Sequence, residues 1–347
     1  MAKFTIAGRL IADNTPCFVI AEIGHNHQGS LDVCRKMFEV AKNCGVNAVK
    51  LQKRNNRELY TENFYDLPYN SENAFGPTYG LHREALELSE SDYVELKEYA
   101  EKLGLIFFAT AFDFFSAEFL NLLDVPCFKV ASGDLTNIPL LKFIAGFGKP
   151  MIISTGASLL DDVKRAYESV YQINKQIALL QCTAIYPTEP EEMDLKVIDT
   201  YKREFPEAVI GLSDHYNGIA LSVSAYVLGA RIIEKHFTLN RATRGTDHAF
   251  SLEPVGMSKM VRDLRRIHIA MGDGVKKFYD KEKPARLKMG KKIVAAHDFE
   301  VGHILTVDDL AFKTPGDGLE PYRVEEFYGK VLKVTLRKDD PLTVDCI

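Results

Sequence analysis

The chain has 347 residues, of which 46% are hydrophobic and 26% are charged, and this composition is that of a folded globular protein rather than a disordered one. Its net charge of -5 at pH 7 argues against nucleic-acid or acidic-membrane partners, because such binding depends on clustered positive surface. The first residues lack a long apolar stretch, and no later run reaches the roughly 18 apolar residues of a membrane span. A cytoplasmic protein without a membrane segment is therefore expected.

The cysteines form no C-x-x-C pair and no cluster. We expect reduced and mostly buried thiols, in place of a disulfide framework or a zinc site. The six cysteines are Cys17, Cys34, Cys44, Cys127, Cys182 and Cys346.

From residue 18 to residue 236, short apolar runs alternate with longer amphipathic stretches, which is typical of βα units around a parallel sheet. The eight predicted strands are Phe18 to Ile23, Ala48 to Gln52, Ile106 to Ala111, Cys127 to Val130, Met151 to Ser154, Ile177 to Cys182, Val209 to Ser213 and Ile232 to His236. The predicted helices are Leu31 to Cys44, Ser91 to Leu103, Leu160 to Asn174, Leu195 to Glu204, Ile219 to Leu228 and Pro254 to Met271. Eight strands with crossovers favour a (β/α)8 barrel over an open sheet.

Two segments depart from this alternation. Residues 54–90 are rich in Tyr, Asn, Pro and Gly, and a connection of that length usually serves as a lid or a binding loop. Residues 273–290 are charged and predict a linker between a barrel domain at 1–272 and a small β-rich domain at 291–347.

The small domain should contain three strands, separated by Gly- and Pro-rich turns. They are Lys292 to Ala296, Ala311 to Lys313 and Val331 to Thr335.

Polar residues close or directly follow every apolar run. In a parallel barrel the carboxyl ends of the strands meet at one face, where the active site lies, so these residues together predict a ligand site. They are Glu22, Lys50, Gln52, Thr110, Lys129, Ser132, Asp134, Ser154, Tyr186, Ser213, Asp214, His215, Glu234, Lys235 and His236.

His215 and His236 end neighbouring strands, which predicts two imidazoles at one height on one side of the barrel mouth. That geometry suits a divalent metal, with Glu22 on the first strand as a further carboxylate. A hydrogen-bonded histidine pair without metal is the alternative. Mixed nitrogen and oxygen ligands leave Mn²⁺, Fe²⁺, Co²⁺ and Zn²⁺ open.

Lys50 and Lys129 end buried strands, where an ammonium group requires an anionic ligand or an acidic partner. Together with nearby hydroxyls they predict binding of phosphate and carboxylate oxygens. A Schiff-base lysine of an aldolase is the alternative on the same fold. No Walker motif, G-x-G-x-x-G or G-x-S-x-G occurs, so nucleotide binding and serine hydrolysis lose support.

Five separated motifs, each at a predicted strand end, resemble the sialic acid synthase family. The C-terminal Val294-Ala-Ala-His-Asp-Phe-Glu-Val-Gly-His and Tyr328-Gly-Lys-Val resemble that family's antifreeze-like SAF domain, a small β-clip fold. The five barrel motifs are Phe-Val-Ile-Ala-Glu-Ile-Gly-His-Asn-His-Gln-Gly-Ser-Leu (18–31), Phe-Lys-Val-Ala-Ser-Gly-Asp (128–134), Ile-Ser-Thr-Gly (153–156), Gly-Leu-Ser-Asp-His (211–215) and Glu-Lys-His-Phe-Thr-Leu (234–239).

The resemblance implies a (β/α)8 barrel in a domain-swapped homodimer that condenses phosphoenolpyruvate with a hexose or amino sugar and water, releasing phosphate. It implies a metal on His215 and His236, most often Mn²⁺, with Mg²⁺ or Co²⁺ as alternatives. Catalytic roles are expected for these histidines and for Glu22 and Glu234, with Glu22 handling the proton of water. Phosphoenolpyruvate would be held by Lys50, Thr110, Lys129, Ser132, Ser154 and Ser213. The residues that would bind the sugar are Gln52, Asp134, Tyr186, Asp247 and Thr314.

The chain departs from the family pattern at three positions. Thr314 stands where bacterial members often carry an arginine that reaches the partner's sugar site. Ala184 replaces an Asn or Ser, and Asp134 replaces a Glu. The acceptor is therefore left open among N-acetylmannosamine, mannose, a 6-phosphate and a diacetamido hexose.

Other motifs, including Thr78-Tyr-Gly-Leu-His-Arg, lean toward the branch with the animal enzymes, some of which accept sugar 6-phosphates. Legionaminate-type and KDN-type synthases remain alternatives. So do the octulosonate and heptulosonate phosphate synthases, but they would leave the antifreeze-like appendage unexplained.

Overall fold

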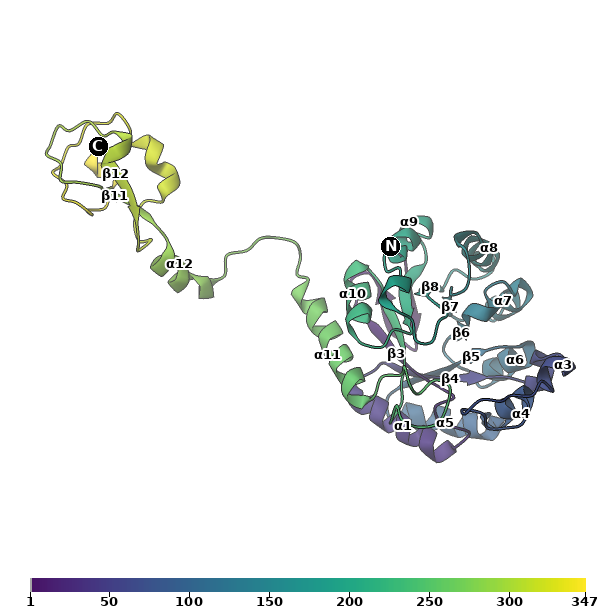
Figure 1. Cartoon of the computed structure of the whole chain (residues 1–347). Helices are drawn as coiled ribbons and strands as arrows, with labels where there is room; N and C mark the ends of the chain where they lie inside the picture. The colour runs from purple at the N-terminus through teal and green to yellow at the C-terminus, as the bar shows by residue number, and fades with distance from the viewer. Residues whose placement is uncertain (1) are drawn as a thin grey trace. The chain divides into compact units, whose positions relative to one another are not determined.

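The eight apolar runs form one closed parallel barrel in the computed structural model, which describes residues 2–347 (Figure 1). Neighbouring strands follow chain order, and β10 closes the ring against β3. The predicted (β/α)8 fold is confirmed, with strand ends within a residue of prediction. The strands are β3 (Phe18–Gly24), β4 (Ala48–Lys53), β5 (Ile106–Ala111), β6 (Phe128–Val130), β7 (Met151–Ser154), β8 (Ile177–Cys182), β9 (Val209–Asp214) and β10 (Ile232–His236).

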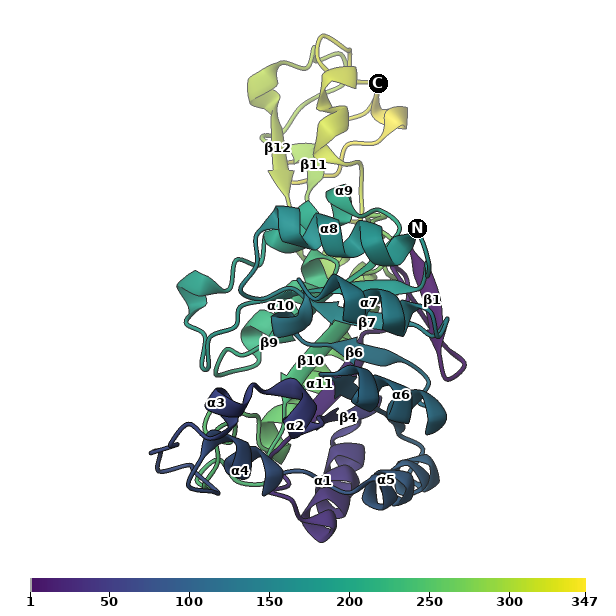
Figure 2. The ribbon, with the colours of Figure 1, turned by 90° about the vertical axis from the view of Figure 1, so that its right-hand side faces the viewer.

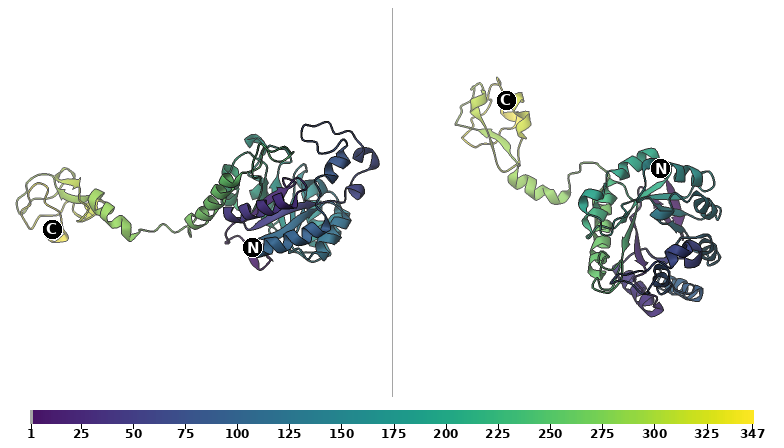
Figure 3. Two further views of the ribbon diagram at one scale, coloured as in Figure 1. Left: turned by 90° about the horizontal axis from the view of Figure 1, so that it is seen from below. Right: turned by 45° about the vertical axis from the view of Figure 1, so that its right-hand side comes forward.

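The strands read as continuous apolar runs because both of their faces are covered: one by barrel interior, the other by helices. Figure 3 shows the helices ringed around the strands of this unit. The helices predicted from periodicity are confirmed, with ends shifted by up to three residues. They are α1 (Leu31–Cys44), α5 (Glu90–Lys102), α8 (Leu160–Tyr171), α9 (Val197–Glu204), α10 (Ala220–Leu228) and α11 (Pro254–Ala270).

Two barrel helices, α6 (Phe114–Leu122) and α7 (Ile138–Ala145), were not predicted. Both are short and mostly apolar, so the contrast between a buried and a solvated face is weak in their sequences. Their N-cap residues are the missed signal: Asp113 accepts a hydrogen bond from Ser116 N, and Asn137 does so from Leu140 N. Figure 2 shows these helices on the outside of the barrel, next to β6 and β7.

The N-terminal residues add an antiparallel hairpin, β1 (Lys3–Ile6) and β2 (Arg9–Ala12), which was also not predicted. Ile6 and Ile11 from this hairpin are buried in the same hydrophobic core as the barrel strands. The hairpin therefore belongs to the first unit of the chain, which ends at Gly272.

Segment 54–90 is not a bare loop, since it contains α2 (Asn56–Leu59), α3 (Glu62–Tyr65) and α4 (Tyr79–Glu84). The rings of Tyr60, Phe64 and Tyr79 pack together within it. At Gly80 a Cβ atom would stand 2.3 Å from the ring of Tyr65, so only glycine permits this approach. Aromatic packing thus gives the segment a defined shape beside the barrel mouth.

The second unit, Asp273–Ile347, has its own hydrophobic core, which includes Ile293, Phe327 and Leu342. Its sheet pairs β11 (Lys292–Ala295) with β12 (Leu310–Lys313) in antiparallel register. Residues 283–289 within the predicted linker form the helix α12 (Lys283–Met289).

The prediction of a strand at residues 331–335 was wrong. That stretch makes only an isolated bridge, Val331 to Ile304, and both Val331 and Val334 are exposed while Leu332 is buried. The chain bends there instead of continuing a two-residue alternation, so no ladder forms.

All six cysteines are free and buried, as expected. Among residues 2–347, no helix has both the length and the apolar character that crossing a membrane requires.

Two of the polar strand-end residues, Asp214 and Lys235, serve the fold. Lys235 Nζ lies 3.0 Å from Asp214 Oδ2, and both side chains are fully buried. Asp214 also accepts hydrogen bonds from Tyr216 N and from the hydroxyl of Ser222, which ties β9 to α10. These side chains point away from the strand-end cavity because neighbouring residues of a strand face opposite sides.

Asp214→Ala is expected to lower the free energy of unfolding by about 3–5 kcal/mol, since it leaves a buried ammonium without its carboxylate. Urea unfolding followed by circular dichroism measures this. Asp161→Ala, on the exposed end of α8, is the control, and a loss in Asp214→Ala as small as in that control would contradict the structural role.

Candidate active site

A cavity of about 470 Å³ opens at the carboxyl ends of the barrel strands, within the range of small-molecule sites. Ten of the predicted residues line it together. They are Glu22, Lys50, Gln52, Thr110, Lys129, Ser132, Ser154, Tyr186, Ser213 and His215. Three further predicted residues also line this cavity, namely Glu234, His236 and Asp247.

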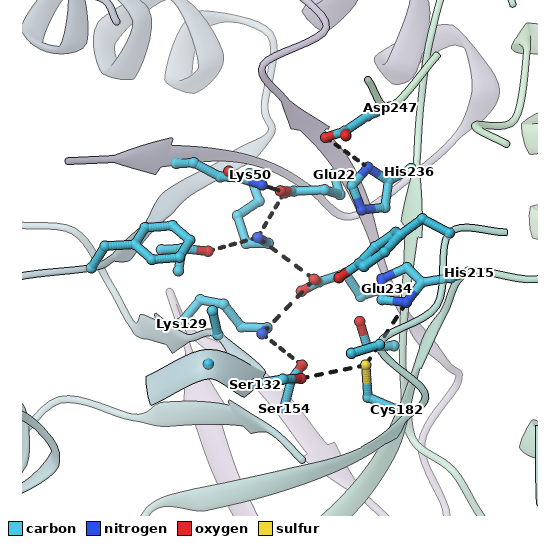
Figure 4. Close-up of a pocket in the computed structure, with 18 of the residues that line it drawn as sticks. Glu22, Lys50, Lys129, Ser132, Ser154, Cys182, His215, Glu234, His236 and Asp247 are labelled. Carbon is cyan, nitrogen blue, oxygen red and sulfur yellow. Dashed lines mark hydrogen bonds and ion pairs between the residues drawn. The ribbon is translucent and has the colours of Figure 1, made fainter. Parts of the chain in front are cut away.

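The two lysines point into the centre of the barrel (Figure 4). Lys50 Nζ lies 2.8 Å from Thr110 Oγ1 and 2.7 Å from a carboxylate oxygen of Glu22. Lys129 Nζ donates to Ser154 Oγ at 2.7 Å. Each ammonium is thus held by a hydroxyl from the neighbouring strand and by one further oxygen, that of Glu22 for Lys50 and the carbonyl oxygen of Val130 for Lys129. One hydrogen of each ammonium is left for an anionic ligand.

Glu234 lies between these lysines, with Oε1 3.6 Å from Lys50 Nζ and 3.9 Å from Lys129 Nζ. Burial would raise the pKa of this carboxyl, but Lys129 and Lys50 outweigh burial and hold the pKa below its usual range. Its second oxygen is buried without a hydrogen-bond partner within residues 2–347. Glu234 is therefore an anion with one oxygen still available to a bound molecule.

Glu22 behaves differently, because burial raises its pKa to about 7 against the lowering effect of Lys50. The register places Glu22 beside Lys50 on β4 and beside His236 on β10. A carboxyl with a pKa near neutrality can both take up and release a proton at pH 7, which is the property of a general acid–base group.

The imidazoles of His215 and His236 lie side by side, with ring centroids 5.4 Å apart. His215 Nδ1 lies 2.8 Å from the carbonyl oxygen of Thr183, so Nδ1 carries the proton and the lone pair of Nε2 is free. Burial lowers the pKa of His236, which keeps that ring neutral as a metal ligand must be.

These two rings fit a divalent ion that takes its other ligands from substrate and water. His236 Nδ1 is buried without a hydrogen bond, and the closest carboxylate oxygen is Asp247 Oδ2 at 3.8 Å. Within the described residues, no group of three or more His, Cys, Asp or Glu side chains is arranged to hold an ion by itself. Such an open site suits catalysis better than a structural role.

Three of the predicted sugar-binding residues line the same cavity, namely Gln52, Tyr186 and Asp247. Gln52 Nε2 donates to Glu22 Oε1 at 2.7 Å, and the ring of Tyr186 packs against His215 at a tilt of 40°, with centroids 4.2 Å apart. A Cβ on Gly24 would lie 3.2 to 3.5 Å from Glu22, Gln52 and Asp247, so glycine leaves room for these three side chains to converge.

The other two predicted sugar residues are Asp134 and Thr314. Asp134 stands outside the cavity lining, where its carboxylate accepts a hydrogen bond from Asn137 Nδ2 at 3.3 Å. Thr314 belongs to the second unit, directly after β12, and its role stays a prediction.

The cavity residues that were not predicted include Arg54, Arg83 and Cys182. Cys182 was expected to be an ordinary buried thiol, yet its sulfur lies 3.5 Å from Ser132 Oγ inside the cavity. The position of Arg54, two residues after Gln52, was an available signal. Arg83 had none, because its place depends on how segment 54–90 folds back.

Residues 37–276 match the NeuB family, and residues 292–347 match the SAF domain. The human protein named N-acetylneuraminate-9-phosphate synthase is 40% identical over 98% of this chain and 95% of its own length. The N,N'-diacetyllegionaminic acid synthase of Campylobacter jejuni is 35% identical over 93% of this chain and 97% of its own.

Among solved structures, the N-acetylneuraminic acid synthetase of Leptospira borgpetersenii, in complex with citrate, superposes with a TM-score of 0.72 at 31% identity. The match covers 82% of this chain and 94% of the Leptospira borgpetersenii chain.

Proposed function

The chain belongs to the NeuB family and ends in a SAF domain, and on this basis we propose that it is a nonulosonic acid synthase. It condenses phosphoenolpyruvate with an open-chain amino sugar or related hexose and water, and it releases phosphate. The observation that carries the proposal is the pair of buried lysines, each bound to a hydroxyl, beside two neutral histidines in one cavity.

Lys50 and Lys129 bind the phosphate and carboxylate of phosphoenolpyruvate. Their ammonium groups stand on facing sides of Glu234, and the hydroxyls of Thr110 and Ser154 orient them. In a buried site these charged donors bind anionic oxygens strongly, because water does not compete. They therefore hold the enol end of the substrate at the centre of the barrel.

His215 and His236 would hold the divalent ion, and Mn²⁺ is the ion that we propose. A cation bound there would act as a Lewis acid on the aldehyde oxygen of the sugar. The chain's own contribution is to present two unprotonated ring nitrogens on neighbouring strands and to orient His215 through the carbonyl of Thr183.

In the reaction, C3 of phosphoenolpyruvate forms a bond to the aldehyde carbon, and the resulting cation at C2 takes up water. Cleavage of the bond between C2 and the phosphate oxygen then leaves a ketone. One proton of the water ends on the former aldehyde oxygen and the other on the departing phosphate. Glu22, with its pKa near 7, handles the proton of the attacking water.

We further propose a domain-swapped homodimer in the cytoplasm, in which the SAF domain of one subunit serves the other subunit's sugar site. Family membership supports this proposal. Sedimentation of the purified full-length chain at monomer mass would contradict it.

One assay tests the function. The purified chain with Mn²⁺, phosphoenolpyruvate and each of a panel of hexoses and amino sugars should release phosphate and yield a product with the summed mass of the sugar and pyruvate. Mass spectrometry identifies the acceptor from the product. No phosphate release with any sugar in the panel would overturn the proposed function.

A further inference from the structure

A second cavity, of about 530 Å³, lies at the amino-terminal ends of β4 and β5, within the size range of small-molecule sites. Its lining includes Arg9 of the N-terminal hairpin, Lys42 near the end of α1, and Arg265 of α11. The active-site cavity opens at the other end of the same strands, and β4 alone spans roughly 17 Å between the two. Figure 2 shows β1 of the hairpin and α3 of segment 54–90 on opposite sides of the barrel.

The charged side chains of this second cavity are all cations. Arg9, Lys42 and Arg265 line it, and no carboxylate does. Other cations on the same two helices have acidic partners, since Lys36 on α1 and Arg262 on α11 each form an ion pair. The three cavity cations form no ion pair within residues 2–347. Three like charges around one cavity repel one another, and a bound anion would remove this cost.

Two glycines let the cations lie close to the backbone. Arg265 Nη2 donates to the carbonyl oxygen of Gly45 at 2.6 Å, and Lys42 Nζ donates to that of Gly104 at 3.4 Å. A Cβ on Gly45 would lie 3.2 Å from Nη1 and Nη2 of Arg265, and one on Gly104 would lie 3.2 Å from Lys42 Nζ. Both glycines also have positive φ, which side chains disfavour. Each cation is thus anchored through one carbonyl oxygen, and its other N–H groups remain available to a ligand.

Asn47, which also lines this cavity, ties three barrel strands together. Its Oδ1 accepts a hydrogen bond from Val19 N at 2.8 Å. Its backbone N donates to Val19 O at 3.0 Å, and its carbonyl oxygen accepts from Ile106 N at 3.1 Å. These bonds join the starts of β3, β4 and β5, so this wall of the cavity is formed by the barrel itself. A ligand therefore binds there without the cost of ordering that wall.

We propose that this cavity is a second anion site, separate from the active site, in which Arg9, Lys42 and Arg265 bind a phosphate group. A phosphate monoester carries about 1.5 to 2 negative charges at pH 7 and three acceptor oxygens, which suits three cationic donors. Guanidinium groups bind phosphate oxygens in paired hydrogen bonds. The cavity is larger than a phosphate group alone, so the expected ligand is a phosphorylated metabolite.

Calorimetric titration of the full-length protein with ribose 5-phosphate and with inorganic phosphate tests the site. Arg265→Gln and Arg9→Gln should each weaken binding of ribose 5-phosphate by about 10-fold, as expected for one lost charged hydrogen-bonding group. Arg9→Gln keeps the test valid if Arg265→Gln disturbs α11, because Arg9 is exposed on the hairpin. Tighter binding of ribose 5-phosphate than of phosphate would assign the site to a phosphorylated metabolite. Equal or weaker binding would assign it to inorganic phosphate.

Arg262→Gln is the matched control, because it removes the same charge from the same helix at a side chain that pairs with Asp263. Its affinity for ribose 5-phosphate should stay within about twofold of wild type. Equal losses in Arg262→Gln and Arg265→Gln would mean that general surface charge attracts the anion, and they would overturn the site. So would a wild type that binds neither ribose 5-phosphate nor phosphate.

Modification with phenylglyoxal, mapped by peptide mass spectrometry, locates the bound anion. At about ten times its Kd, ribose 5-phosphate should slow modification of Arg9 and Arg265 by about 10-fold, but not that of Arg262. The KM for phosphoenolpyruvate in Arg265→Gln should equal that of the wild type, because the two cavities lie at opposite ends of the barrel. Protection of Arg54 and Arg83 alone would place the anion in the active-site cavity and contradict the second site.

Discussion

His236→Ala is expected to lower bound Mn²⁺ and kcat together, with kcat falling by about 10²- to 10³-fold. The ring of His236 is buried beside His215, and its removal leaves one imidazole in the cavity. A single imidazole holds a divalent ion far more weakly than two do, and the polarisation of the aldehyde is lost with the ion. Metal analysis of the dialysed protein and steady-state kinetics measure both effects.

The control for this substitution is His297→Ala, since His297 is exposed in the second unit. Its metal content and rate should match those of the wild type. Full metal occupancy in His236→Ala would refute the ligand assignment. Normal occupancy with a lost rate would instead favour a hydrogen-bonding role for the histidine pair.

Lys129→Met is expected to lower kcat/KM for phosphoenolpyruvate by about 10²- to 10³-fold, because one buried charged donor to an anionic substrate disappears. The methionine side chain is similar in length and apolar, so the barrel interior stays filled. The KM for the sugar should change much less. Calorimetric binding of phosphoenolpyruvate reports the loss without depending on turnover.

Lys164→Met is the control, since Lys164 sits on the outside of α8 and pairs with Glu204.

Treatment with sodium borohydride distinguishes anion binding by Lys129 from the imine chemistry of a Schiff-base aldolase. Mass spectrometry after reduction with substrates present should show no covalent adduct on the wild type. An adduct that disappears in Lys129→Met would assign the lysine to imine chemistry and contradict its role as an anion-binding group.

Much of the site was visible in the sequence because of one property of parallel barrels. Every strand ends at the same face, so polar residues that close separate apolar runs come together regardless of their distance in the chain. Lys50, Lys129, His215 and His236 were predicted in this way and line one cavity. The strand alternation then distinguishes His215 from Asp214, which faces the helix layer.

The amino-acid sequence by itself thus determined the barrel, the strand that carries each lysine and histidine, and the presence of a separate C-terminal domain. These depend on short-range patterns, namely apolar runs and the polar residues that end them. Only the tertiary structure decided the protonation of the two buried carboxyl groups, because the pKa values of Glu22 and Glu234 are shifted in opposite directions by the groups packed around them.

The placement of Arg83 was likewise decided only in three dimensions. It reaches the cavity because the packing of segment 54–90 carries α4 back to the barrel mouth. There His25, which directly follows β3, contacts Arg54 and Arg83. Contacts between residues 29 and 58 positions apart along the chain leave no periodic trace in the sequence, so only the folded chain reveals which charges share one site.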